Sequence, residues 1–132
     1  MFRNLFSSTR SSIAQISPAE LKQRLQNKDS LVMVDVRSPE EYAHDGHISG
    51  VRLMPLPVIP VRSQELPKDK PIVCVCRSGA RSQVACETLQ RQGFTQVMNL
   101  SGGMIAWQRA VESNEGGRRD HRLTPSQTRL LS

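Results

Sequence analysis

Residues 72–92 read IVCVCRSGARSQVACETLQRQ, and this stretch predicts a strand, a tight loop and a helix in direct succession. The apolar run from Ile72 to Val75 has the length of a buried strand, whereas residues 81–92 favour a helix that Gly93 would close. Cys76 is therefore expected in a loop that leads into a helix N-terminus. The free backbone amides and the dipole at such a position favour an anion.

The rest of the chain alternates the same two kinds of element. Residues 17–20 (SPAE) and 38–41 (SPEE) are capping boxes that start two helices, the second of which Gly46 should end. Further strands are expected at 31–36, 52–56 and 97–100, a helix at 103–112, and a proline-rich loop at 55–67 with at most a brief helix between Val58 and Leu66. Strands that alternate with helices over short connections imply parallel crossovers. The predicted fold class is therefore α/β, with helices on both faces of a mostly parallel sheet.

The length of 132 residues suits one domain with a hydrophobic core. We divide the chain into an N-terminal extension at 1–12, the domain at 13–112, and a flexible, basic tail at 113–132. No apolar run approaches the roughly 20 residues of a membrane-spanning helix, so no transmembrane segment is expected.

The net charge of +6 is spread along the chain and not gathered in one patch. Residues 1–16, 17–112 and 113–132 each carry +2, and a single Trp and a single Tyr offer no platform on which bases could stack. Binding to nucleic acid is therefore not expected. The basic N-terminus resembles a short mitochondrial transit peptide or a membrane-surface helix, but its shortness favours an ordinary extension of a cytoplasmic protein. The mitochondrial matrix is the alternative location.

The three cysteines fit neither a disulfide framework nor a zinc site. We expect Cys74 and Cys76 to point to opposite faces of the strand and not to bridge. Cys74 and Cys86 are expected to be thiols of the core and not a resolving pair. This use of cysteine favours a reducing compartment.

Cys76 is the candidate nucleophile. In open α/β sheets the ligand crevice lies beyond the carboxyl ends of the strands, which is where a strand ending at Val75 places this thiol. Arg77 and Arg81 add positive charge, so the pKa of Cys76 should fall below the usual value of about 8.5. Only four residues separate Cys76 from Arg81, so the loop can surround only a small anionic group.

Several motifs, taken in chain order, resemble the signatures of one protein family. They are 35–37 (DVR), 41–42 (EY), 46–50 (GHISG), 76–82 (CRSGARS) and 102–107 (GGMIAW). Together they resemble a single-domain rhodanese-like protein, the thiosulfate sulfurtransferase family, over about residues 13–112. The resemblance implies a three-layer α/β/α fold with a central, mostly parallel sheet of about five strands, including a short strand near 14–16.

The resemblance also implies an activity. A Cys76 thiolate would take the outer sulfur of thiosulfate or a related donor, hold it as a persulfide, and pass it to cyanide or to a thiol acceptor such as thioredoxin or glutathione. This scheme requires no metal and no organic cofactor. The loop residues assigned to substrate binding are Arg77, Ser78, Gly79, Ala80, Arg81 and Ser82.

Asp35 and Arg37 resemble family positions that brace the site, and a structural role is favoured over chemistry for both. Arg37 could equally pair with Glu40 or Glu41 in the helix that follows. His47 is interpreted as a hydrogen-bonded structural residue and not as a catalytic base.

Two other functions stay open. Phosphatases and arsenate reductases of the same fold have one more residue between Cys and Arg, so the four-residue spacing from Cys76 to Arg81 disfavours them. A persulfide carrier or interaction module would use the same cysteine with another protein as its partner. Val51 and residues 53–55 (LMP) depart from the family pattern at the pocket mouth, which leaves the preferred donor open.

Overall fold

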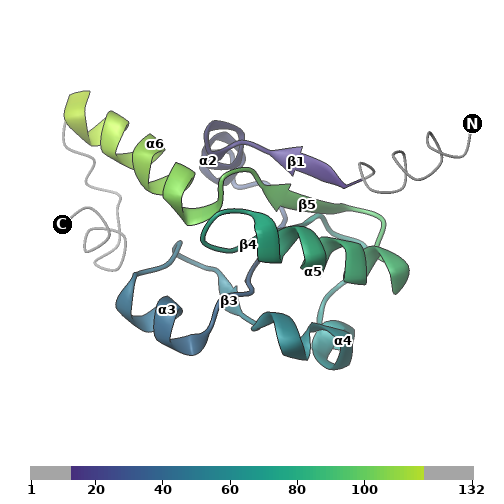
Figure 1. Cartoon of the computed structure of the whole chain (residues 1–132). Coiled ribbons are helices and arrows are strands. Elements are labelled where there is room, and N and C mark those ends of the chain that lie inside the picture. Colours follow the sequence, from purple (N-terminus) through teal and green to yellow (C-terminus); the bar gives the residue numbers. More distant parts are fainter. Residues whose placement is uncertain (1–12, 118–132) are drawn as a thin grey trace, which may run out of the picture.

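Five parallel strands form one sheet with helices on both of its faces (Figure 1). The computed structural model describes residues 13–117, and the strand order β1-β5-β4-β2-β3 places β4 at the centre. The strands are β1 (Ala14–Ile16), β2 (Val32–Asp35), β3 (Arg52–Leu53), β4 (Ile72–Val75) and β5 (Val97–Leu100). The helices are α2 (Pro18–Gln26), α3 (Pro39–His44), α4 (Ile59–Arg62), α5 (Ala80–Arg91) and α6 (Gly103–Gly117), with 3₁₀ turns η1 (Leu56–Val58) and η2 (Ser63–Glu65).

The two faces of β4 separate the core into two halves. One face buries Ile72 and Cys74 against α4 and α5, and the other buries Val73 and Val75 against α2 and α6. All four side chains are fully buried, as expected for a central parallel strand that is covered on both faces. The structure therefore confirms the predicted three-layer α/β/α fold with a parallel sheet of five strands.

The expectation that Cys74 and Cys76 face opposite sides of the strand is wrong. Side chains alternate along a strand with a period of two residues, so positions 74 and 76 share a face. Both lie in the half of the core beneath α5, which also contains Cys86, and all three are free thiols. A hydrogen bond with Cys86 and burial raise the pKa of Cys74, which makes it an inert core thiol as predicted.

Both predicted capping boxes are present. The hydroxyl of Ser17 accepts a hydrogen bond from the amide of Glu20 at 3.1 Å, and the Glu20 carboxylate accepts one from the amide of Ser17 at 2.8 Å. The equivalent bonds between Ser38 and Glu41 measure 3.2 and 3.1 Å. These reciprocal bonds satisfy the free amides that begin α2 and α3.

Several boundaries differ from the predicted ones. β3 ends at Leu53, but the amides of Met54 and Leu56 still donate to the carbonyls of Asp35 and Val36 at 2.8 and 2.9 Å, so bonds to the segment of β2 continue over the predicted length. The proline-rich segment forms the short turns η1, α4 and η2, in agreement with the brief helix expected there. The last helix continues from the predicted end at 112 to Gly117.

The interpretations of residues 1–12 and 118–132 lie outside the described part of the chain. Between residues 13 and 117, no helix combines the length and the apolar character needed to cross a membrane.

Asp35 and Arg37 form a buried ion pair at the end of β2, and Arg37 also bonds to the turn that follows α3. Arg37 is 2% exposed and Asp35 is 0% exposed. Nη2 of Arg37 donates to Oδ2 of Asp35 at 2.7 Å and to the carbonyl oxygen of Gly46 at 2.7 Å. The alternative pairing of Arg37 with Glu40 or Glu41 is therefore wrong, because the guanidinium turns into the core and satisfies buried oxygens there.

We predict that Arg37→Met lowers the free energy of unfolding by about 3 to 5 kcal/mol, because it leaves the Asp35 carboxylate buried without its partner. Urea unfolding followed by circular dichroism measures the loss. Arg62→Met is the control, since it removes an arginine whose ion pair with Glu65 is exposed, and it should cost far less. Equal losses in the two variants would contradict the prediction.

Candidate active site

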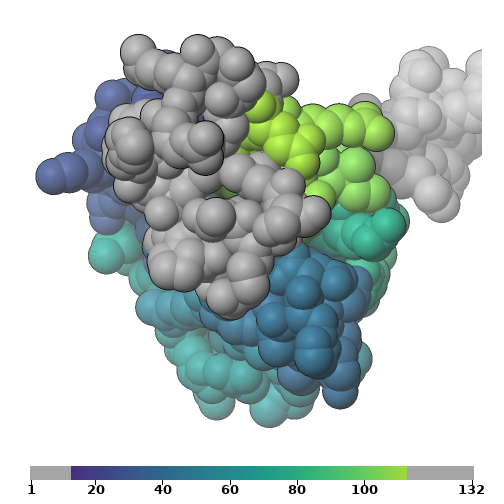
Figure 2. All heavy atoms as spheres, turned by 90° about the vertical axis from the view of Figure 1, so that its left-hand side faces the viewer, coloured from purple at the N-terminus to yellow at the C-terminus, as the bar shows by residue number. Residues whose placement is uncertain are grey.

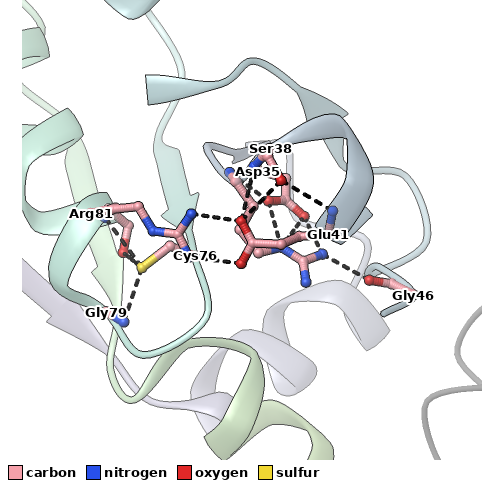
Figure 3. A network of polar contacts seen from close by, with 9 residues as sticks. Asp35, Ser38, Glu41, Gly46, Cys76, Gly79 and Arg81 are labelled. Carbon is pink, nitrogen blue, oxygen red and sulfur yellow. Dashed lines mark hydrogen bonds and ion pairs between the residues drawn. The ribbon is translucent and has the colours of Figure 1, made fainter. Parts of the chain in front are cut away.

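The loop after β4 closes around the sulfur of Cys76 (Figure 3). Gly79 adopts a φ of +104° and forms the N-cap of α5, so the chain turns from strand to helix within a few residues. A side chain at position 79 would be strained at this φ, and its Cβ would lie 3.4 Å from the backbone of Gly102. Gly79 thus supplies a backbone conformation that lets the loop close.

Three hydrogen-bond donors surround Sγ of Cys76. The amide of Gly79 lies 3.0 Å from the sulfur, the amide of Ser82 3.4 Å and the hydroxyl of Ser82 3.3 Å. Burial raises the pKa of the Cys76 thiol, but these donors and the amide of Ser78 outweigh burial, so the pKa lies below its ordinary value. The predicted direction is confirmed, although hydrogen bonds and not the two arginine charges are its main cause.

The Ser82 hydroxyl has a second partner that the sequence analysis missed. It lies 2.5 Å from Oδ1 of Asn99, a buried residue of β5. Nδ2 of Asn99 faces three acceptors, namely Oε1 of Gln15, the carbonyl of Gly79 and Oε1 of Gln83, at 3.0 to 3.2 Å. These acceptors fix the amide orientation, so Asn99 presents an acceptor to Ser82. The single hydroxyl proton therefore serves either Asn99 or the sulfur.

The first turn of α6 holds the loop from the other side. The amide of Met104 donates to the carbonyl of Cys76 at 2.8 Å, and the amide of Ile105 donates to the carbonyl of Arg77 at 3.1 Å. A Cβ at Gly103 would lie 2.5 Å from both carbonyl oxygens, so only glycine permits this approach. The Gly102-Gly103 motif thus acts on the conformation of the loop.

Arg81 points away from the loop and forms an ion pair with Glu41 of α3 (Figure 3). Nη1 and Nη2 of Arg81 donate to Oε1 and Oε2 of Glu41 at 2.7 and 2.8 Å, which is a bidentate geometry. The hydrogen bonds from Arg81 hold the pKa of Glu41 at about 2, despite partial burial. The sequence analysis placed Arg81 next to an anion, but it did not identify Glu41 as that anion.

The remaining predicted site residues are those of the loop, assigned to substrate binding, and the supporting pair Asp35 and Arg37. Arg77, Ser78 and Ala80 are exposed on the outer side of the loop, whereas Ser82 is fully buried beneath the sulfur. Asp35 and Arg37 lie at the end of β2, where they form a buried ion pair with each other and no hydrogen bond to the sulfur.

Two further predictions concern His47 and metal binding. His47 stacks on Tyr42 with 3.7 Å between ring centroids, and its Nδ1 lies 3.0 Å from the Tyr42 carbonyl, which agrees with the structural role predicted for it. Among the described side chains, those of residues 13–112, there is no cluster of three or more His, Cys, Asp or Glu that could hold a metal ion.

The missed residue Asn99 does leave a signal in the sequence. It interrupts the apolar strand Val97–Leu100, and asparagine is depleted in strands, so a buried partner could have been sought for it. The sequence contains no comparable signal for Glu41, because a capping box already accounts for a glutamate at that position.

Comparison with known proteins places this geometry in a family. Residues 17–110 match the rhodanese-like domain family. A sulfurtransferase of Allochromatium vinosum is 44% identical over 97 residues, which are 74% of this chain and 90% of the relative. A putative sulfur carrier protein of Bacillus subtilis, YrkF, is 41% identical over 97 residues, which are 74% of this chain but 52% of that protein.

Solved structures agree with this assignment. The crystal structure of a rhodanese-like domain protein from Staphylococcus aureus superimposes with a TM-score of 0.68 and 35% identity, covering 72% of this chain and 91% of that one. With the cysteine loop, the glycine pair and the fold in place, the chain belongs to the rhodanese-like domain family.

Proposed function

We propose that this protein is a sulfurtransferase that carries sulfane sulfur as a persulfide on Cys76. The observation that carries the proposal is the position of Sγ, which accepts hydrogen bonds from the amides of Gly79 and Ser82 at the N-terminus of α5. These donors stabilise a thiolate, which is the form of cysteine that attacks sulfur. The relatives named as a sulfurtransferase and as a sulfur carrier support sulfur as the transferred group.

In the first half-reaction, the Cys76 thiolate attacks the outer sulfur of thiosulfate or a related donor. A bond forms between Sγ and that sulfur, the sulfur–sulfur bond of thiosulfate breaks, and sulfite leaves with the electron pair. The product on the enzyme is a persulfide anion. Because charge on the enzyme stays next to the loop, the same preorganised amides stabilise both the thiolate and the persulfide.

In the second half-reaction, an acceptor nucleophile attacks the outer sulfur of the persulfide and releases the Cys76 thiolate. Cyanide serves as the acceptor in the test tube and leaves as thiocyanate. In the cytoplasm, a thiol such as thioredoxin or glutathione would take the sulfur. The reaction cycle uses no metal and no organic cofactor.

A persulfide carrier is the second candidate, because one of the relatives is named as a sulfur carrier. A carrier would hold the same persulfide but would release it only to a protein partner. Turnover with small donors and acceptors separates the two functions, since an enzyme cycles with them and a carrier is loaded only once. Phosphatase or arsenate chemistry is disfavoured, because only four residues separate Cys76 from Arg81.

Treatment with thiosulfate should add about 32 Da, the mass of one sulfur atom, to the wild-type protein, because Cys76 is the expected nucleophile. Intact-mass spectrometry detects the adduct, and cyanide should then release thiocyanate. Cys76→Ser should give neither product, whereas Cys86→Ser, which removes a buried core thiol, should give both. A sulfur adduct on the Cys76→Ser protein would refute the proposed mechanism.

Removal of the Ser82 hydroxyl should raise the pKa of Cys76, since a side-chain donor that lowers this pKa is lost. The Cys76 pKa is depressed in the folded protein, so the thiolate persists as pH falls until that pKa is reached. In Ser82→Ala, the acid limb of the rate of persulfide formation should therefore shift to higher pH.

Ser78→Ala is the matched control for this measurement, because the Ser78 side chain is exposed and its amide, which contributes to the shift, is retained. The acid limbs of the wild-type and Ser78→Ala profiles should lie at the same pH. If the acid limb of Ser82→Ala lies at the same pH as that of the wild type, the Ser82 hydroxyl does not lower the pKa of Cys76.

A further inference from the structure

The ion pair between Glu41 and Arg81 leaves the mouth of the loop with less positive charge than its sequence indicates. Arg81 stands in the first turn of α5, two residues beyond the Gly79 N-cap, and its charge acts on the Cys76 sulfur. Both of its terminal nitrogens nevertheless donate to the two carboxylate oxygens of Glu41. An incoming anion therefore meets a neutralised guanidinium and not a free one.

The carboxylate of Glu41 is held in place independently of Arg81. Its Oε1 accepts a bond from the Ser38 amide at 3.1 Å and one from the Ser38 hydroxyl at 3.2 Å. α3, which carries Glu41, lies at the molecular surface (blue in Figure 2), yet the Glu41 side chain is only 25% exposed. With a pKa of about 2, Glu41 stays ionised at every pH at which a thiolate can be assayed.

The other charged groups beside the loop do not replace the neutralised charge. Arg37 is buried in its ion pair with Asp35, so its charge is compensated as well. Arg77 is exposed and has no carboxylate partner among the described side chains of residues 13–112, which leaves it as the loop's uncompensated arginine within that range. Its single positive charge only offsets the single negative charge of a thiolate at the preceding residue, Cys76. A donor that carries two negative charges therefore gains little electrostatic attraction at this mouth.

We propose that Glu41 is a specificity-determining residue that withholds the charge of Arg81 from the donor and so disfavours dianionic thiosulfate relative to hydropersulfides. This inference rests on the proposed sulfur transfer and names the class of donor. In the favoured reaction, the Cys76 thiolate attacks the terminal sulfur of R–S–SH. The bond between Sγ and that sulfur forms, the S–S bond of the donor breaks, and the leaving thiolate takes the proton to depart as R–SH.

The decisive variant is Glu41→Gln, which keeps the shape of the side chain and removes its negative charge. Thiosulfate and cysteine hydropersulfide serve as the two donors, and the rate of persulfide formation on Cys76 is followed by mass. We expect kcat/KM for thiosulfate to rise about three- to tenfold, because a dianion now meets a free Arg81. With cysteine hydropersulfide, kcat/KM should change by less than about twofold.

The control is Glu40→Gln, which removes the same charge one residue earlier on α3, where the side chain is exposed and does not contact Arg81. It should leave both donors unchanged. Arg81→Met supplies the second test, because it leaves the charge of Glu41 uncompensated beside the mouth of the loop. In this variant kcat/KM for thiosulfate should fall, and it should fall more than that for cysteine hydropersulfide. No fall with thiosulfate in Arg81→Met, an equal change with both donors, or a loss with thiosulfate in Glu41→Gln would each overturn the proposal.

Alkylation of Cys76 separates this inference from the proposed function. Iodoacetate and iodoacetamide differ by one negative charge and need no sulfur transfer, and the ratio of their rates cancels any change in the thiolate fraction. Glu41→Gln should raise the rate for iodoacetate relative to that for iodoacetamide by about twofold or more. An unchanged ratio refutes the charge effect even if sulfur transfer is found. A raised ratio in a protein that neither donor can persulfidate refutes the proposed function but not the effect of Glu41 on the charge at the mouth.

Discussion

The contact between the first turn of α6 and the cysteine loop is the constraint on which the rest of the site depends. The amides of Met104 and Ile105 hold the carbonyls of Cys76 and Arg77, and the approach is possible only because residue 103 is glycine. With those carbonyls turned outward toward α6, the loop amides can turn inward toward the sulfur. The anion-binding geometry at α5 is thus imposed partly by a different helix, which comes later in the chain and packs on the opposite face of the sheet.

Two ion pairs lie beside this loop, and their environments give them different roles. Arg37 and Asp35 are almost completely buried, so their pairing is a condition for burying either charge at all. Arg81 and Glu41 are partly exposed, at 39% and 25% of their side chains, so each could be hydrated without the other. Mutual neutralisation is therefore the main effect of the second pair, and solvent screening keeps its contribution to stability small. The first pair supports the fold, whereas the second adjusts the charge that a substrate meets.

Sequence reasoning succeeded where the interacting groups are close in the chain. The capping boxes and the succession of strand, loop and helix around Cys76 depend on neighbouring residues, and the structure confirms them. It failed where partners come from distant segments, as for Glu41 with Arg81 and for Asn99 with Ser82. The pairing of Arg37 was ambiguous because three carboxylates lie within local reach, and burial decided between them. The expectation that Cys74 and Cys76 face opposite sides of the strand failed for another reason. The two-residue period of a strand is a local rule, and it already puts both side chains on the same face.

The Ser82 hydroxyl sets a limit on how acidic the Cys76 thiol can become. Asn99 cannot release Ser82 by turning its amide, because its Nδ2 is held by three acceptors. When the sulfur becomes a thiolate, the hydroxyl proton must leave its 2.5 Å contact with Oδ1 to reach the sulfur, and Oδ1 then lies buried without a donor. The cost of that loss offsets part of the gain at the sulfur. In a persulfide the charge moves about 2 Å outward to the second sulfur. In the persulfide that we propose, the hydroxyl could return to Asn99, and this contact would then favour the loaded state over the empty thiolate.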